Sequence, residues 1–163
     1  MRVFLGTDHA GLELKSHLMQ VLADEGFEPV DCGAFDYDPQ DDYPPFCFEV
    51  GERVVTEPGS LGIVIGGSGN GEQIAANKVP GVRAALVWNT ATAQLARQHN
   101  DANVVAVGAR QHSDEEATAL VLEFLGTPFS GDERHVRRIG LISDYERDRH
   151  RPAGGLPTRS RHP

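Results

Sequence analysis

The chain has 163 residues, of which 39% are hydrophobic and 24% charged, a composition typical of one soluble domain with a sizeable core. Its net charge of −9 argues against general nucleic-acid binding, and no apolar run is long enough to cross a membrane. There is no apolar signal-peptide core near its start and no metal-ligand spacing of its two cysteines, so we expect a reducing cytoplasm and free thiols.

Apolar stretches with strand spacing and with helix spacing alternate along the chain. The pattern predicts strands at residues 2–7, 27–32, 63–65, 82–87 and 103–107. It predicts helices at residues 12–25, 46–55, 72–78, 90–98, 114–125 and 132–149. We expect a single domain over residues 1–149, with an irregular acidic loop at 33–45. Residues 150–163, rich in Pro, Gly and Arg, are predicted to be a disordered tail.

Strands that alternate with helices through short links predict an α/β fold, in which a five-stranded parallel sheet is covered by helices on both faces. In such sheets ligands bind beyond the carboxyl ends of the strands, where the strand order switches direction. Polar residues follow three of the predicted strand ends: Asp8-His9, Ser68 to Glu72, and Arg110. We therefore expect these groups to share one edge of the sheet.

The stretch from Leu61 to Lys78 carries the strongest functional signal, because a buried strand, a glycine-rich turn and a helix follow one another directly. Glycines let a ligand approach the backbone, and the first amides of a helix have no internal partners, so the turn predicts an anion site. Within it, Ser68 and Glu72 offer a free hydroxyl and a carboxylate. The alternative is purely structural, since such turns, and carboxylates in first helical turns, are common. The spacing fits neither a Walker loop nor a dinucleotide fingerprint.

Other polar groups allow a structural interpretation beside a functional one. Asp8 could simply cap a helix, and His99-Asn100 could simply end one. Arg134 and Arg138 share one helix face, where they could clamp a phosphate or form a solvated basic face. The carboxylates of residues 36–42 lack EF-hand spacing, so we expect a solvated loop and no metal site.

Six short motifs occur in order along residues 2–147. They are Gly6-x-Asp8-His9-Ala10-Gly11, Asp42-Tyr43-Pro44, Gly66-Gly67-Ser68-Gly69-Asn70-Gly71-Glu72, Ala75-Ala76-Asn77-Lys78, Arg97-Gln98-His99-Asn100 and Arg134-His135-x-x-Arg138. The chemical groups among them, namely a carboxylate base, a hydroxyl and amides for an oxyanion, a His/Asp pair and arginines, together describe a site for a phosphorylated polyol. The motifs resemble the type B ribose-5-phosphate isomerases, whose wider family includes galactose-6-phosphate isomerase subunits.

The resemblance implies a Rossmann-like three-layer α/β/α sandwich and a homodimer, and it leaves open whether two dimers pair into a tetramer. It also implies interconversion of ribose 5-phosphate and ribulose 5-phosphate, with no metal or cofactor, at a site shared by two subunits. One subunit would contribute Asp8, Ser68 and Glu72, the loop residues Gly67, Gly69, Asn70 and Gly71, and His9 as a phosphate ligand. The other would contribute His99, Asn100, Arg110, Arg134 and Arg138.

One position departs from the common family pattern. Many members carry a cysteine, whose thiolate is the base, where this chain has Ser68, and a serine hydroxyl is far too weak an acid to replace it alone. The pairing of Ser68 with Glu72 resembles the actinobacterial branch, in which the carboxylate one helical turn on is the base.

The implied mechanism gives each group a role. We expect Glu72 to carry the C2 proton to C1, Ser68 and the loop amides to stabilise the cis-enediolate, and His99 with Asp8 to open the furanose ring. The helix amino terminus lowers the pKa of Glu72 and desolvation raises it, and the sequence leaves open which effect is larger.

Three alternatives compete with this interpretation. The chain could isomerise another sugar phosphate, such as allose or galactose 6-phosphate or a tetrose phosphate. It could be a non-catalytic regulator that binds phosphosugars, although such a protein should have lost the base. A nucleotide-binding module is disfavoured by the missing lysine–serine pair and third glycine.

Overall fold

The computed structural model describes residues 1–149, so the predicted disordered tail lies outside the described residues. The described part falls into two compact units, residues 1–130 and 131–149. The strands are β1 (Arg2–Thr7), β2 (Glu28–Asp31), β3 (Leu61–Gly66), β4 (Ala84–Leu86) and β5 (Val104–Gly108). The helices of the first unit are η1 (His9–Gly11), α1 (Leu12–Asp24), α2 (Tyr43–Thr56), α3 (Asn70–Ala76), α4 (Thr90–Asn100) and α5 (Asp114–Gly126). The second unit contains α6 (Glu133–Asp148). None of the helices in the described part is long and apolar enough to span a bilayer.

The five strands form one parallel sheet in the order β2-β1-β3-β5-β4. This confirms the predicted parallel sheet and supplies the order of the last two strands, which the sequence did not fix. Thr7 pairs with Ile65, and Gly66 pairs with Gly108, so β1, β3 and β5 end at the same edge. β2 lies on one side of β1 and β3 lies on the other, so the order in which strands are added to the sheet reverses direction at β1. The loops after β1 and β3 therefore flank the switch point where ligands bind in such sheets.

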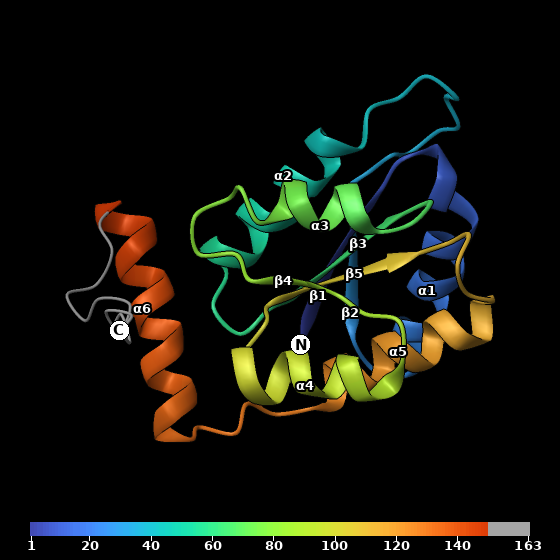
Figure 1. The fold of residues 1–163 in the computed structure, drawn as a ribbon. Helices are drawn as coiled ribbons and strands as arrows, with labels where there is room; N and C mark the ends of the chain where they lie inside the picture. Colours follow the sequence, from blue (N-terminus) through green and yellow to red (C-terminus); the bar gives the residue numbers. More distant parts are fainter. Residues whose placement is uncertain (150–163) are drawn as a thin grey trace, which may run out of the picture. The chain divides into compact units, whose positions relative to one another are not determined.

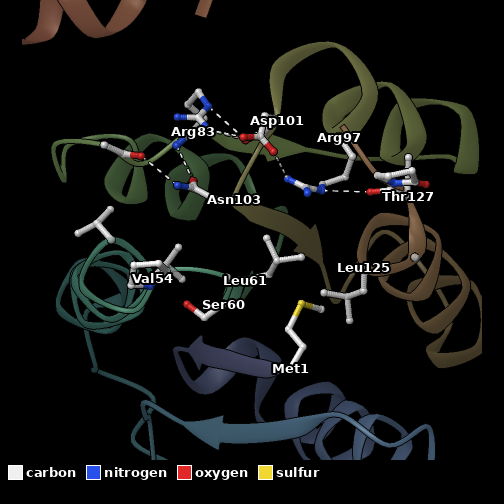
Figure 2. Close-up of a pocket in the computed structure, with 16 residues that line it drawn as sticks. Met1, Val54, Ser60, Leu61, Arg83, Arg97, Asp101, Asn103, Leu125 and Thr127 are labelled. Carbon is white, nitrogen blue, oxygen red and sulfur yellow. Dashed lines mark hydrogen bonds and ion pairs between the residues drawn. The ribbon is translucent and has the colours of Figure 1, made fainter. Parts of the chain in front are cut away.

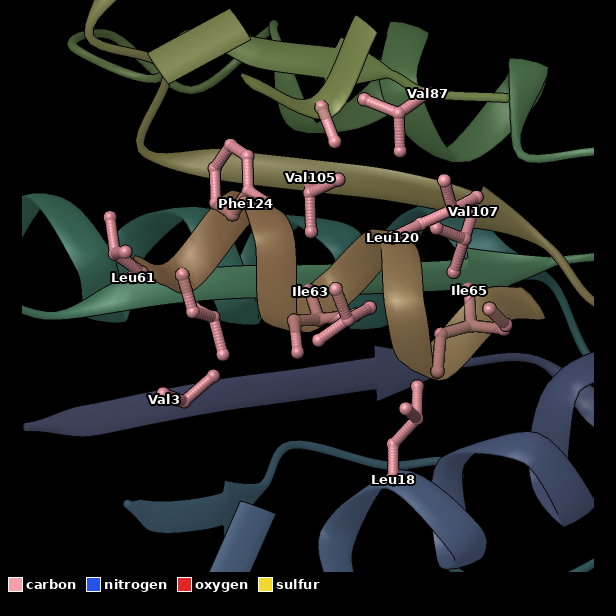
Figure 3. Close-up of a cluster of buried hydrophobic side chains, with 14 of the residues drawn as sticks. Val3, Leu18, Leu61, Ile63, Ile65, Val87, Val105, Val107, Leu120 and Phe124 are labelled. Carbon is pink, nitrogen blue, oxygen red and sulfur yellow. The ribbon is translucent and has the colours of Figure 1, made fainter. Parts of the chain in front are cut away.

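Helices cover both faces of the sheet and complete the predicted three-layer sandwich (Figure 1). On one face α1, α4 and α5 pack over a buried cluster in which Leu18 and Phe124 contact side chains of the central strands (Figure 3). On the other face α2 and α3 pack over a second cluster that includes Phe4, Cys47 and Val64. The central strand β3 is buried along its whole length, as expected of a parallel strand between two helical layers. Successive side chains of β3 point to opposite faces of the sheet and pack into the two clusters. This packing on both sides fixes the position of the loop that follows β3.

Two helices begin before the positions that the sequence predicted. α2 begins at Tyr43, three residues early, because Pro44 and Pro45 fit a first helical turn, whose amides lack internal partners anyway. α3 begins at Asn70 behind Gly69, whose positive φ of 80° forms its amino-terminal boundary. At the start of α5, Ser113 caps the helix and forms a reciprocal capping box with Glu116.

Candidate active site

The loop after β3 places a buried carboxylate at the carboxyl edge of the sheet. Glu72 lies in the first turn of α3, and only 4% of it is exposed. Its carboxylate lies against the backbone of Gly66, so closely that a Cβ at that position would overlap it. The glycine-rich sequence therefore makes room for the side chain of Glu72 as well as for a ligand.

The surroundings of Glu72 decide the question that the sequence left open. Burial, the largest effect, raises the pKa of this carboxyl above its ordinary value, and the negative charge of Asp8 raises it further. The backbone amides of Glu72 and Gly69 lower the pKa through hydrogen bonds, but they do not outweigh burial. A carboxylate with a raised pKa is a stronger base than an ordinary glutamate, which suits proton abstraction.

The cysteines offer no competing base. Cys47 lies on α2 and is completely buried, and burial, with smaller contributions from Glu72 and Asp8, raises the pKa of its thiol to about 12. Burial likewise raises the pKa of Cys32 to about 11. Both thiols are free of disulfides, as expected, and both stay protonated near neutral pH, so neither supplies the thiolate that Ser68 replaces.

The rest of the loop presents hydrogen-bonding groups at the surface. Ser68 is exposed, and its Oγ accepts weak hydrogen bonds from the backbone and side-chain nitrogens of Asn70, both at 3.3 Å. The sequence had suggested a free hydroxyl, whereas the structure shows that the Ser68 Oγ already accepts hydrogen bonds. Its own O–H is still available to donate. The ring of Tyr43 packs directly over Gly71. In the sequence Tyr43 stands out only as part of a motif, and its role in shaping the loop depends on a contact that the sequence does not reveal.

Asp8 and His9 follow β1 at the same edge. The Asp8 carboxylate caps η1 by accepting a 3.0 Å hydrogen bond from the amide of Ala10, which confirms the structural alternative. Asp8 is also buried, and its negative charge raises the pKa of Glu72. The residue therefore both caps a helix and belongs to the candidate site. His9 pairs through its ring Nδ1 with Asp41 at 2.6 Å. The expectation of a fully solvated acidic loop is wrong for Asp41, whose side chain is only 11% exposed.

Arg110 also lies at this edge, next to the glycine-rich loop. Its amide donates a 3.1 Å hydrogen bond to the carbonyl of Gly67, and its guanidinium lies beside the same residue. The resemblance assigns Arg110 to the second subunit, and that assignment stays a prediction; within one chain the structure places Arg110 next to the glycine-rich loop. The reason is the topology, since β5 is the direct neighbour of β3.

His99 and Asn100 lie at the opposite edge of the sheet. They end α4, and β5 begins only four residues after Asn100, so they lie near the amino ends of the strands. Glu72 and Ser68 lie beyond the carboxyl ends. β5 has five residues and rises about 3.3 Å per residue, so the two edges are on the order of 13 Å apart. One chain therefore does not bring His99 to Glu72.

The two pockets described in the first unit lie at these two edges. A pocket of about 460 Å³ is lined by Ser68 and Asn70 together with Trp88, Gln111 and His112, and it belongs to the glycine-rich loop. The larger pocket, about 650 Å³, lies at the amino edge (Figure 2). Although it is larger, it contains none of the predicted catalytic residues.

Two arginines of the larger pocket hold the turn after α4 (Figure 2). Arg83 donates to the carbonyls of Asn100 and Asp101, at 2.9 and 2.7 Å. Arg97 donates to the Asp101 carboxylate at 2.8 Å and to the carbonyl of Ala102 at 2.7 Å. Asp101 itself has a positive φ of 43°. We interpret this network as support for the turn that presents His99 and Asn100, rather than as an anion site.

Comparison with known proteins defines the family. The model of a family described as Ribose/Galactose Isomerase matches residues 3–142. The chain belongs to the ribose/galactose isomerase family. Ribose-5-phosphate isomerase B of Mycobacterium tuberculosis (strain H37Rv) is 56% identical over 152 residues, which cover 93% of this chain and 94% of that protein.

Solved structures of family members have the same fold. The ribose-5-phosphate isomerase B of Mycoplasma genitalium, solved with bound ribulose-5-phosphate, matches with a TM-score of 0.86 and 43% identity over 90% of this chain and 97% of that one. The enzyme of Clostridium thermocellum matches with a TM-score of 0.87 and 39% identity, over 92% of this chain and 100% of that one.

Within this family member, the predicted site residues fall into three groups. At the carboxyl edge the structure brings together Asp8, His9, Gly67, Ser68, Gly69, Asn70, Gly71, Glu72 and Arg110. His99 and Asn100 lie at the amino edge. Arg134 and Arg138 lie on α6 in the second unit, and their contribution to the site stays a prediction.

Proposed function

We propose that this chain interconverts D-ribose 5-phosphate and D-ribulose 5-phosphate by proton transfer through a cis-enediolate. The observation that carries the proposal is Glu72, a buried carboxylate of raised pKa at the switch point of the sheet. Family membership supports the substrate class, because a relative 43% identical has been solved with ribulose-5-phosphate bound. Phosphosugar isomerisation of this kind belongs to the non-oxidative branch of the pentose phosphate pathway.

Glu72 acts as the base in this mechanism. The C1 carbonyl of the open-chain aldose acidifies the C2 proton, and Glu72 removes it to give the enediolate. The same carboxyl returns a proton to C1, while the proton of the C2 hydroxyl moves to the C1 oxygen, so that C2 becomes the carbonyl of the ketose. Negative charge that develops on the carbonyl oxygen is stabilised by the Ser68 hydroxyl and the amides of the glycine-rich loop. His9 and Arg110, at the same edge, hold the phosphate.

The active unit is a homodimer in this proposal. The separation of His99 and Asn100 from Glu72 across the sheet supports it, because a second copy can bring its own His99 to the carboxyl edge of the first. That copy supplies Arg134 and Arg138 as well. α6 exposes Val136, Ile142 and Tyr145 by about half, and such an apolar surface is suited to contact with another chain. The two free, buried cysteines support a cytoplasmic location.

Turnover of a panel of sugar phosphates tests the proposed substrate. We expect purified protein in the presence of EDTA to convert ribose 5-phosphate, with a kcat/KM at least about tenfold above those for allose 6-phosphate, galactose 6-phosphate and erythrulose 4-phosphate, because binding energy from a matched substrate is used in the transition state. Preference for another sugar would retain the mechanism and change the substrate. Binding of all of them without turnover would identify a regulator and contradict the proposal.

A further inference from the structure

We propose that Asp41 is a positioning residue that holds the imidazole of His9 so that ring atom Nε2 meets the phosphate of the substrate. The inference rests on the proposed phosphosugar activity and adds a residue to it. Asp41 lies in the acidic loop between β2 and α2, a loop whose sequence predicts a solvated segment. Its side chain is only 11% exposed and forms hydrogen bonds with His9, a residue of the candidate site.

Two hydrogen bonds join Asp41 to His9. Oδ1 of Asp41 lies 2.6 Å from Nδ1 of the ring and accepts a 3.1 Å hydrogen bond from the His9 amide. The same oxygen therefore fixes both the backbone and the ring of His9. Oδ2 is buried and has no hydrogen-bond partner among residues 1–149. A carboxylate in such a place loses hydration without full compensation, which indicates a function other than keeping the loop in water.

The loop that carries Asp41 is anchored at its start. Lys15, 3% exposed, donates to the Asp31 carboxylate at 2.5 Å and to the carbonyl of Ala34 at 2.6 Å. Before Asp41, the ring of Tyr37 meets the ring of His9 edge-on, with centroids 6.0 Å apart and planes at 87°. The imidazole is thus held by Asp41 at Nδ1 and packed against Tyr37.

This geometry determines which ring nitrogen is available to a ligand. With a proton on Nδ1 donated to Asp41, Nε2 is the remaining nitrogen of His9. The oxygens of a phosphate dianion only accept, so Nε2 must also carry a proton when the dianion binds. The ring then has one positive charge, and Asp41 is its counter-ion. The carboxylate of Asp8 and the phenol ring of Tyr37 also lie close to His9: the ligand atoms of Asp8, His9 and Asp41 are all within 4.8 Å of one another, and the Tyr37 ring contacts the imidazole edge-on.

A cluster of two carboxylates and an imidazole is also a set of metal ligands. The 2.6 Å separation between His9 Nδ1 and Asp41 Oδ1 is that of a hydrogen bond, which needs a proton where a metal would take the nitrogen lone pair. The geometry therefore favours phosphate recognition, and metal binding becomes an outcome of the test.

A double-mutant cycle on KM tests whether Asp41 acts through His9. We expect Asp41→Asn and His9→Gln each to raise the KM for ribose 5-phosphate and the inhibition constant of inorganic phosphate by about tenfold, with kcat changed by less than about threefold. The double variant should be no worse than either single variant, because the second change removes nothing further. Asp36→Asn removes a charge from the same loop at an exposed position and should leave both constants unchanged. Multiplying effects in the double variant, or an unchanged KM in Asp41→Asn, would overturn the proposal.

Nitrogen-15 NMR of His9 in the wild-type protein tests the geometry without any turnover. We expect a protonated Nδ1 in the free protein, protons on both nitrogens when inorganic phosphate is added, and loss of the Nδ1 signature in Asp41→Asn. These results would stand even if ribose 5-phosphate proved not to be the substrate, so the two proposals fail separately. An unprotonated Nδ1 in the free wild-type protein would overturn the inference. So would stoichiometric Zn²⁺ binding at His9 that is lost in Asp41→Asn, with no response to phosphate.

Discussion

Replacing Glu72 with glutamine is expected to lower kcat for ribose 5-phosphate by about a thousandfold, within the range that general base catalysis contributes. The amide keeps the shape of the carboxyl but cannot accept the C2 proton. KM should change little, because the groups assigned to the phosphate, His9 and Arg110, are untouched. Steady-state kinetics of the purified variant measures both constants.

A matched control separates the base from a general loss of charge. Glu52→Gln makes the same chemical change at an exposed position on α2, and its kcat should equal that of the wild type. Substantial residual isomerisation in Glu72→Gln, within about tenfold of the wild type, would remove Glu72 from the role of base.

The same variant is expected to be more stable than the wild type at neutral pH. Burial raises the folded-state pKa of Glu72, so the folded protein binds the proton of this carboxyl more tightly than the unfolded chain does. The stability associated with the neutral carboxyl is present below the ordinary pKa of glutamate and is lost as the pH rises through the raised folded pKa. Thermal unfolding should therefore show a Tm gain for Glu72→Gln near pH 7 that shrinks towards pH 4.

The second large effect is expected when two inactive variants are mixed. In the proposed dimer each site takes Glu72 from one subunit and His99 from the other. A mixed dimer of Glu72→Gln and His99→Ala subunits has one site with both changes and one site with neither. Random pairing makes about half of the dimers mixed, so coexpression should restore about a quarter of wild-type activity from two nearly inactive parents.

The control for this experiment uses two changes in the same half of the site. Glu72→Gln mixed with Ser68→Ala leaves no intact site in any dimer, and activity should stay at the mean of the two parents. Failure of Glu72→Gln and His99→Ala to complement, in subunits shown to exchange, would mean that the site lies within one chain.

The sequence was most informative where local physics and topology agree. The apolar run of β3, the glycines after it and the first turn of α3 predicted a buried strand and a ligand loop. The parallel arrangement then predicted that Asp8, Glu72 and Arg110 meet at one edge, as they do. These inferences needed only the direction of the strands and not their order.

The sequence was least informative where segments distant along the chain meet. The pairing of Asp41 with His9 joins residues 32 positions apart, and an acidic loop without a metal spacing gives no sign of it. Tyr43 packs on Gly71 only because α2 and α3 lie on the same face of the sheet (Figure 1). The balance of effects on the pKa of Glu72 depends on burial, which a sequence does not state.

Isomerisation of ribose 5-phosphate in D₂O, followed by proton NMR, tests most directly whether a carboxylate carries the proton through an enediolate. A proton held by Glu72 can exchange with solvent before it returns to carbon, so ribulose 5-phosphate formed early in the reaction should carry deuterium at C1 in a measurable fraction of molecules. Complete transfer of the C2 hydrogen to C1, with no deuterium incorporated at any stage, would indicate a direct hydride shift and contradict the role assigned to Glu72.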